Sequence, residues 1–159
     1  MIFRLTYKIV NKAFRLIYLM FTPQLWRKNI QLYGIPRIDN VEKLKIGQHV
    51  SINGNTYIQC TGGVILGDYV TVSYGCVILT TGIKTENYST ECQTQYRKHD
   101  NAPVIIGEGV WLGACAKIMP GCSIAKHIIV GAGSVVTRDL DKEGWLYAGV
   151  PARPIKPLS

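Results

Sequence analysis

Three histidines are the side chains best suited to acid–base chemistry, because an imidazole gains and loses a proton near neutral pH. His99 lies in the polar segment 84–102, directly between Lys98 and Asp100. His49 and His127 occupy turn positions of the apolar repeat described below, where polar residues are common. A polar segment of this length inside a compact domain is more often functional than not. We therefore predict that His99 is a general base.

The cysteines and histidines do not form a pattern typical of metal binding. The five cysteines lack any CxxC pair, and the three histidines are far apart in the sequence. We expect no cleavable signal sequence before them. We expect reduced thiols in a cytoplasmic protein and no metal site.

The elements that must position His99 are indicated by an apolar repeat with a period of six residues. Such a period fits neither a helix nor an amphipathic strand, but it matches a short strand followed by a turn. It stops between Ile83 and Pro103, so residues 84–103 are expected to form a loop ejected from the repeat. The repeated aliphatic residues are Ile46, Ile52, Ile58, Leu66, Val72, Ile78, Ile106, Leu112, Ile118, Ile124, Val130 and Val136.

Three such hexads make one triangular coil, in which the aliphatic residues point inward and stack on those of the next coil. A mostly small or β-branched residue follows each aliphatic position by four. Glycines directly after several aliphatic positions, such as Gly67 and Gly113, are expected to supply permissive backbone at the turns. The sequence therefore predicts an all-β solenoid, a parallel β-helix of about four coils. An ordinary β-sandwich would need irregular spacing and hairpin signals.

Residues 34–157 resemble the hexapeptide-repeat acyltransferases of left-handed β-helix fold. The resemblance is densest in the segments 106–114, 119–124, 130–139 and 149–153. Within that family the chain looks most like the sugar and polysaccharide O-acetyltransferases that act on galactosides and maltose. The resemblance implies a homotrimer with left-handed coils. It also implies transfer of an acetyl group from acetyl-CoA to a sugar hydroxyl of a capsular, O-antigen or other glycoconjugate.

The resemblance also assigns residues to the acetyl-CoA groove between subunits. Trp111 would form a wall of the groove, and small residues would allow close backbone approach to the pantetheine arm. Positive side chains would face the nucleotide phosphates. The small residues are Gly113, Ala114, Gly131 and Ala132, and the positive ones are Arg138, Arg153 and Lys156.

The acceptor side departs from the family pattern at one position. In the sugar O-acetyltransferases the base usually follows a Thr-Gly pair, whereas Ile83 follows Thr81-Gly82 here. Some members instead carry a histidine shortly before a Pro-Val strand, as His99 stands before Pro103-Val104. Glu86, Glu91 and Asp100 are alternatives for orienting its ring. Asn53 matches the position at which relatives hold the acceptor, and Arg97 and Lys98 would suit an acidic sugar.

The N-terminal segment carries much of the positive charge. Residues 1–40 hold seven basic side chains against Asp39 alone, which gives +6 of the chain's total of +8. Four of them recur at helical spacing, and apolar residues occupy the other face, so residues 1–40 are predicted to contain a basic amphipathic helix followed by the solenoid domain at 41–159. Two interpretations stay open: a peripheral contact with the inner membrane leaflet, or a cap on the first coil. Nucleic acid is not an expected partner.

The sequence leaves three alternatives to sugar acetylation. A xenobiotic such as an antibiotic could be the acceptor. The absence of a histidine at Ile83 would suit a non-catalytic binding scaffold. A carbonic-anhydrase-like metalloenzyme shares the fold, but two of its three zinc ligands need close spacing that this sequence lacks.

Overall fold

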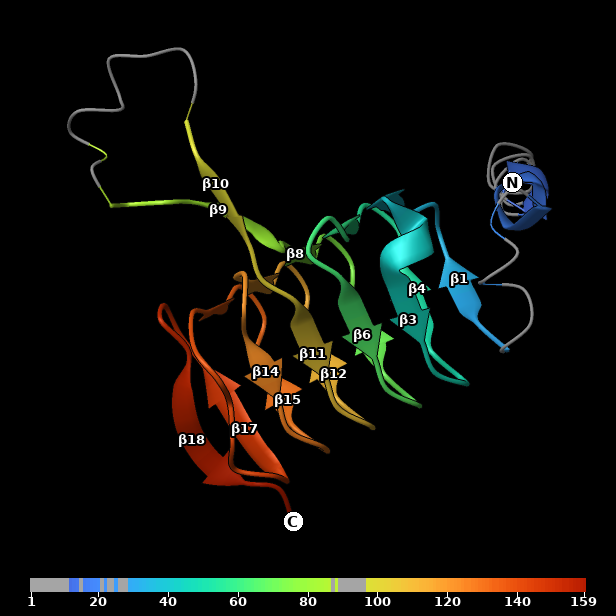
Figure 1. Ribbon diagram of the computed structural model, residues 1–159. Coiled ribbons are helices and arrows are strands. Elements are labelled where there is room, and N and C mark those ends of the chain that lie inside the picture. Colours follow the sequence, from blue (N-terminus) through green and yellow to red (C-terminus); the bar gives the residue numbers. More distant parts are fainter. Residues whose placement is uncertain are drawn as a thin grey trace.

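The computed structural model describes residues 12–14, 16–20, 22, 25, 29–86, 88 and 97–159, and its main body is a three-sided parallel β-solenoid (Figure 1). The first face is the sheet β1 (Gln31–Tyr33), β4 (Ser51–Asn53), β7 (Thr71–Val72), β12 (Trp111–Leu112), β15 (Ile129–Val130), β17 (Trp145–Ala148) and β18 (Arg153–Pro157). The second face is β2 (Arg37–Asp39), β5 (Tyr57–Gln59), β8 (Val77–Ile78), β13 (Lys117–Ile118) and β16 (Val135–Val136). The third face is β3 (Leu44–Ile46), β6 (Val64–Leu66), β11 (Val104–Ile106) and β14 (Ser123–Ile124).

The apolar repeat of the sequence becomes the core of this solenoid. Every repeated aliphatic residue is buried, and equivalent residues pair between coils, as Ile58 does with Ile78 on the second face. The prediction of a parallel β-solenoid is confirmed, with about five coils in place of about four. Because β1 and β2 pair with β4 and β5, the first coil begins at Gln31, earlier than the boundary expected at residue 41. A short 3-10 helix, η1 (Val41–Lys43), follows β2.

The glycines that follow aliphatic positions have a different role from the one expected. Positive φ angles occur elsewhere, for example at Gly63, His49 and Cys115, whereas Gly67 and Gly113 have none. A Cβ at Gly67 would lie 2.7 Å from the Glu108 nitrogen, and one at Gly113 would lie 2.6 Å from the Ala132 nitrogen. These glycines are therefore required by the close stacking of coils, and not by left-handed backbone.

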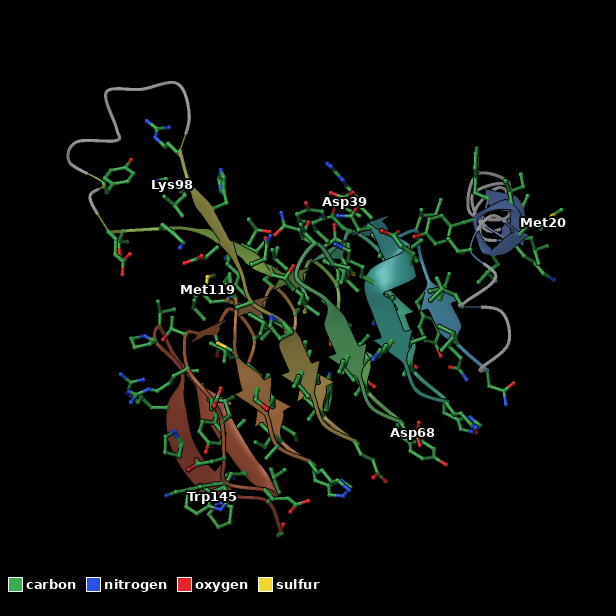
Figure 2. The ribbon with its side chains drawn as sticks, viewed as in Figure 1. Met20, Asp39, Asp68, Lys98, Met119 and Trp145 are labelled. Carbon is green, nitrogen blue, oxygen red and sulfur yellow. The ribbon has the colours of Figure 1, made fainter. Side chains whose placement is uncertain are left out.

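The expected ejected loop leaves the third coil between β8 and β11. Its two arms pair as an antiparallel ribbon, β9 (Thr81–Ile83) with β10 (His99–Asn101). The ribbon projects away from the solenoid, and Lys98 lies at its outer part (Figures 1 and 2). The root of the ribbon is held by the Ala102 amide, which donates to the Thr80 carbonyl at 2.9 Å.

The N-terminal and C-terminal segments lie at opposite ends of the stack (Figure 1). Residues 12–14 and 16–20 are helical and lie beside the first coil. At the other end, β18 folds back antiparallel on β17. Within the described residues, no helix combines the length and apolar character needed to cross a bilayer.

Candidate functional site

His99 lies on β10 directly opposite Ile83 on β9. Residues paired in this way across an antiparallel ladder project from the same face, with Cβ atoms about 5 Å apart. The Thr81 hydroxyl donates to the Asn101 side-chain oxygen at 2.8 Å, which shows that these paired residues also share a face. His99 is therefore presented next to Ile83, the position where the sugar O-acetyltransferases usually carry their base, and its side chain is exposed.

The carboxylate of Asp100 belongs to the opposite face of the ribbon. Asp100 is paired with Gly82, and its carboxylate lies 3.4 Å from the Lys84 ammonium. Alternation along a strand places Asp100 and His99 on opposite sides, so Asp100 is not positioned to orient the imidazole. Of the other two candidates for that role, Glu86 is exposed and Glu91 lies outside the described residues.

The other two histidines are exposed turn residues, as expected. His49 and His127 both adopt left-handed backbone, with φ of 56° and 55°. The His49 ring stacks on Tyr69 at 5.1 Å between centroids. In the described part of the chain, no group of three or more His, Cys, Asp or Glu side chains could hold a metal ion.

A second group of predicted site residues gathers on the first face of the solenoid. Trp111 is about half exposed, and its indole nitrogen donates to the Ser73 hydroxyl at 2.9 Å, which fixes the ring against the preceding coil. Asn53 is paired with Tyr33 on the same sheet, and its amide donates to the Val72 carbonyl at 3.2 Å. Ser73 was not identified from the sequence, although it follows Thr71, the residue that pairs with Trp111, by two positions.

The small residues of the predicted groove follow the strands of this face. Gly113 comes directly after β12 and Gly131 after β15, and their amides donate to the next coil. Ala114 and Ala132 come next and are exposed. Within the described residues, the backbone N–H groups of these two alanines donate to no acceptor. Two amide donors without a partner, on exposed residues of successive coils, suit a ligand that carries amide carbonyl groups.

The predicted phosphate-binding residues lie near the C-terminal end of the stack. Arg138 and Arg153 line one pocket of about 240 Å³, together with Asp139, Asp141 and Tyr147. Both carboxylates already accept hydrogen bonds within the chain, Asp139 from the Ser123 amide and Asp141 from the Tyr147 hydroxyl. Lys156 lies outside this lining, on β18, where it pairs with Leu146. Lys142 also lines the pocket, and its ammonium lies 4.5 Å from the Trp145 ring centre. Three cations are therefore placed to meet an anionic group here.

The two groups of predicted residues do not meet within one chain. Arg97, Lys98 and His99 belong to the ribbon, which leaves the corner between the second and third faces. Asn53 and Trp111 belong to the first face, which lies across the triangle from that corner. Arg97 lies 5.9 Å from the Tyr88 ring centre, also on the ribbon side. A site that uses both groups needs a second copy of the chain.

Comparisons with known proteins agree with this architecture. The family model "Bacterial transferase hexapeptide (six repeats)" matches residues 103–138, and "Hexapeptide repeat of succinyl-transferase" matches residues 43–80. Galactoside O-acetyltransferase of Escherichia coli K12 is 30% identical over 116 residues, which are 73% of this chain and 55% of that protein. The chain therefore spans little more than half the length of this curated relative.

Two solved structures have the same solenoid. A maltose O-acetyltransferase from Clostridium difficile 630 aligns with a TM-score of 0.69 and 26% identity, over 82% of this chain and 67% of that chain. A galactoside acetyltransferase in complex with coenzyme A aligns with a TM-score of 0.71 and 25% identity, over 82% of this chain and 64% of that chain.

Proposed function

Because this chain is a hexapeptide-repeat protein with sugar acetyltransferases among its relatives, we propose that it transfers an acetyl group from acetyl-CoA to a sugar hydroxyl. The observation that carries the proposal is the pairing of His99 with Ile83, which presents an imidazole beside the position that the family pattern reserves for the base. The finer proposal is that the acceptor belongs to a capsular, O-antigen or other glycoconjugate. The projecting ribbon supports it, because a large acceptor can approach from outside the solenoid.

In the proposed reaction the His99 imidazole accepts the proton of the sugar hydroxyl as its oxygen attacks the thioester carbonyl. The carbon–sulfur bond breaks, the acetyl group stays on the sugar oxygen, and the imidazolium returns the proton to the departing sulfur. Backbone N–H groups that point at the carbonyl oxygen would stabilise the negative charge that develops there. The free amide of Ala114, beside the Trp111 wall, is the described donor best placed for this role.

The donor acetyl-CoA fits the features of the first face. The amide of Ala132 can donate to an amide carbonyl of the pantetheine arm, while that of Ala114 meets the thioester carbonyl at the end of the arm. Arg138 and Arg153 supply positive charge for the phosphates at the far end of such a ligand. The absence of a Cβ at Gly113 and Gly131 allows the coils to stack closely along this path.

We further propose that the active unit is a homotrimer. Because His99 and the first-face residues lie on different sides of one chain, each site would combine the ribbon of one copy with the first face of its neighbour. Threefold symmetry closes such a head-to-tail contact, since every copy then offers and receives the same surface. We also propose a cytoplasmic location, in which the exposed thiol of Cys115 would stay reduced.

The proposal is tested by incubating the purified chain with acetyl-CoA and a panel of neutral and acidic glycans. An antibiotic with a free hydroxyl serves as the xenobiotic alternative. Release of the coenzyme A thiol is measured together with the mass of the acceptor. We expect a glycan to gain one acetyl group for each thiol released. Binding of coenzyme A without thioester cleavage, for every acceptor, would favour the non-catalytic scaffold that Ile83 suggests.

A further inference from the structure

The N-terminal helical residues present an apolar stripe to solvent. Ala13, Leu16, Ile17 and Met20 follow the spacing i, i+3, i+4 and i+7, which places them on one face of a helix. All four are exposed, with exposed fractions of 57% for Leu16, 49% for Ile17 and 69% for Met20. Phe14 borders the stripe and is 53% exposed. Figure 2 shows Met20 on the side of the helix that faces away from the solenoid.

A different side of the same helical residues attaches them to the solenoid. Tyr18 and Leu19 pack against the core, and burial raises the pKa of the Tyr18 phenol. The chain then passes through Thr22, whose hydroxyl donates to the Tyr18 carbonyl at 2.8 Å, to the fully buried Leu25. The helical residues thus have a fixed inner side, and capping of the first coil does not use the stripe.

The net charge of residues 1–40 bears on what could cover the stripe. Residues 1–40 carry a net charge of +6, and Lys12 is exposed one position before the stripe begins. Two stripes in a symmetric contact would bring equal positive charges together, where like charges repel. A surface with an apolar interior and anionic groups on its outside would match both the apolar stripe and the positive charge. Basic helices with one apolar face bind membrane interfaces in this way.

We infer that the stripe docks onto an anionic phospholipid surface, with Leu16, Ile17 and Met20 inserted among the acyl chains. The helical residues would lie in the plane of the surface, and the solenoid, attached through Tyr18 and Leu19, would stay in water. This inference does not depend on acetyl transfer. It reconciles the two interpretations of the N-terminal segment, because the inner side of the helix caps the solenoid while its outer side meets lipid.

The test is flotation of the full chain with vesicles of phosphatidylcholine alone or of phosphatidylcholine with phosphatidylglycerol at three to one. We expect partition onto the anionic vesicles and much weaker partition onto the neutral ones. The triple substitution Leu16→Ser, Ile17→Ser and Met20→Ser should lower this partition about tenfold or more. The matched control Ile65→Ser with Ile105→Ser removes exposed apolar side chains from the third face and should leave partition unchanged.

Equal partition of the wild-type chain and the triple variant would overturn the inference. So would failure of the wild-type chain to bind anionic vesicles. Sedimentation velocity without vesicles tests whether a second copy of the chain covers the stripe instead. A triple variant with a lower mass than the wild-type assembly would show that the stripe contacts a second copy. That result would also contradict docking on lipid. Circular dichroism of both variants confirms that the solenoid is retained.

Discussion

The imidazole of His99 and the side chain of Ile83 project from the same face of a two-stranded ribbon, directly opposite each other. This arrangement has a chemical consequence for a chain whose Thr81-Gly82 pair lacks the histidine usual after it. A base supplied from β10 can reach nearly the same region as one supplied from β9, because paired Cβ atoms are about 5 Å apart. In the proposed mechanism, the strand pairing of the ribbon would let His99 replace the missing residue.

We predict that the two positions can exchange roles. Adding Ile83→His to His99→Ala should restore acetyl transfer by about tenfold or more over His99→Ala alone, because the imidazole returns to the same face. The matched control adds Lys84→His to His99→Ala, which places an imidazole on the opposite face and should restore nothing. Rates are measured by thiol release. Equal rates for both double variants would argue against a shared position.

Charge at the C-terminal pocket should control affinity for the donor. We expect Arg138→Ala and Arg153→Ala each to raise the KM for acetyl-CoA about tenfold, because each removes a cation that would pair with phosphate. Neither substitution should change the rate of acetyl transfer from acetyl-pantetheine, because this donor lacks the nucleotide and its phosphates. Lys126→Ala is the control, since Lys126 is exposed and pairs with Glu108 away from the pocket. If the arginine variants also raised the KM for acetyl-pantetheine about tenfold, the two arginines would not act by binding phosphate.

The stability of the solenoid should depend on its stacked aliphatic residues. Ile118 on β13 is completely buried, so Ile118→Ala should lower the free energy of unfolding by about 2–5 kcal/mol through lost burial and a cavity. Ile105 on β11 faces outward and is 41% exposed, and Ile105→Ala should cost less than about 1 kcal/mol. Urea denaturation measures both values. If the two variants lost similar amounts of unfolding free energy, the prediction that stacked inward residues stabilise the solenoid would be wrong.

The cysteines should differ in reactivity in the folded protein. Burial raises the pKa of Cys60 to about 12 and that of Cys76 to about 11, and it also raises the pKa of Cys122. Because the thiolate is the reactive form, a raised pKa lowers the thiolate fraction at pH 8 and slows alkylation. Cys115 is exposed and should be alkylated first by iodoacetamide.

Peptide mass spectrometry of a Cys92→Ser variant measures the order of labelling, and this variant removes the cysteine outside the described residues. Coenzyme A should slow labelling of Cys115, because that residue follows Ala114 in the proposed donor groove. Alkylation of Cys60 or Cys76 as fast as that of Cys115 in the native protein would contradict the buried positions.

The solenoid could be predicted from the sequence because its signal is repeated in every coil. An inward aliphatic residue recurs at a spacing that no helix or simple strand explains, and register then follows from stacking equivalent residues. The role of the glycines could not be predicted in this way. Whether Gly113 serves a turn or a close approach depends on the separation of neighbouring coils, which the local sequence does not encode.

The sequence could nominate candidate site residues one by one, but it could not predict their arrangement. His99 stood out as an imidazole in a polar segment, yet its pairing with Ile83 depends on the register of two strands separated by a long loop. The spacing could not exclude Asp100 as the group that orients the ring, whereas the ribbon places it on the other face with Lys84. The sequence also could not predict whether the N-terminal stripe faces solvent or the solenoid, because helical periodicity identifies a face but not what it contacts.

The most direct test of the central claim compares catalysis with donor binding in His99→Ala. If His99 is the base, the rate of acetyl transfer should fall by about 10²–10⁴, because the attacking hydroxyl loses its proton acceptor. The dissociation constant for coenzyme A, measured by calorimetry, should stay within about twofold, because the donor contacts lie on the first face. A variant that keeps most of the wild-type rate would show that another group accepts the proton.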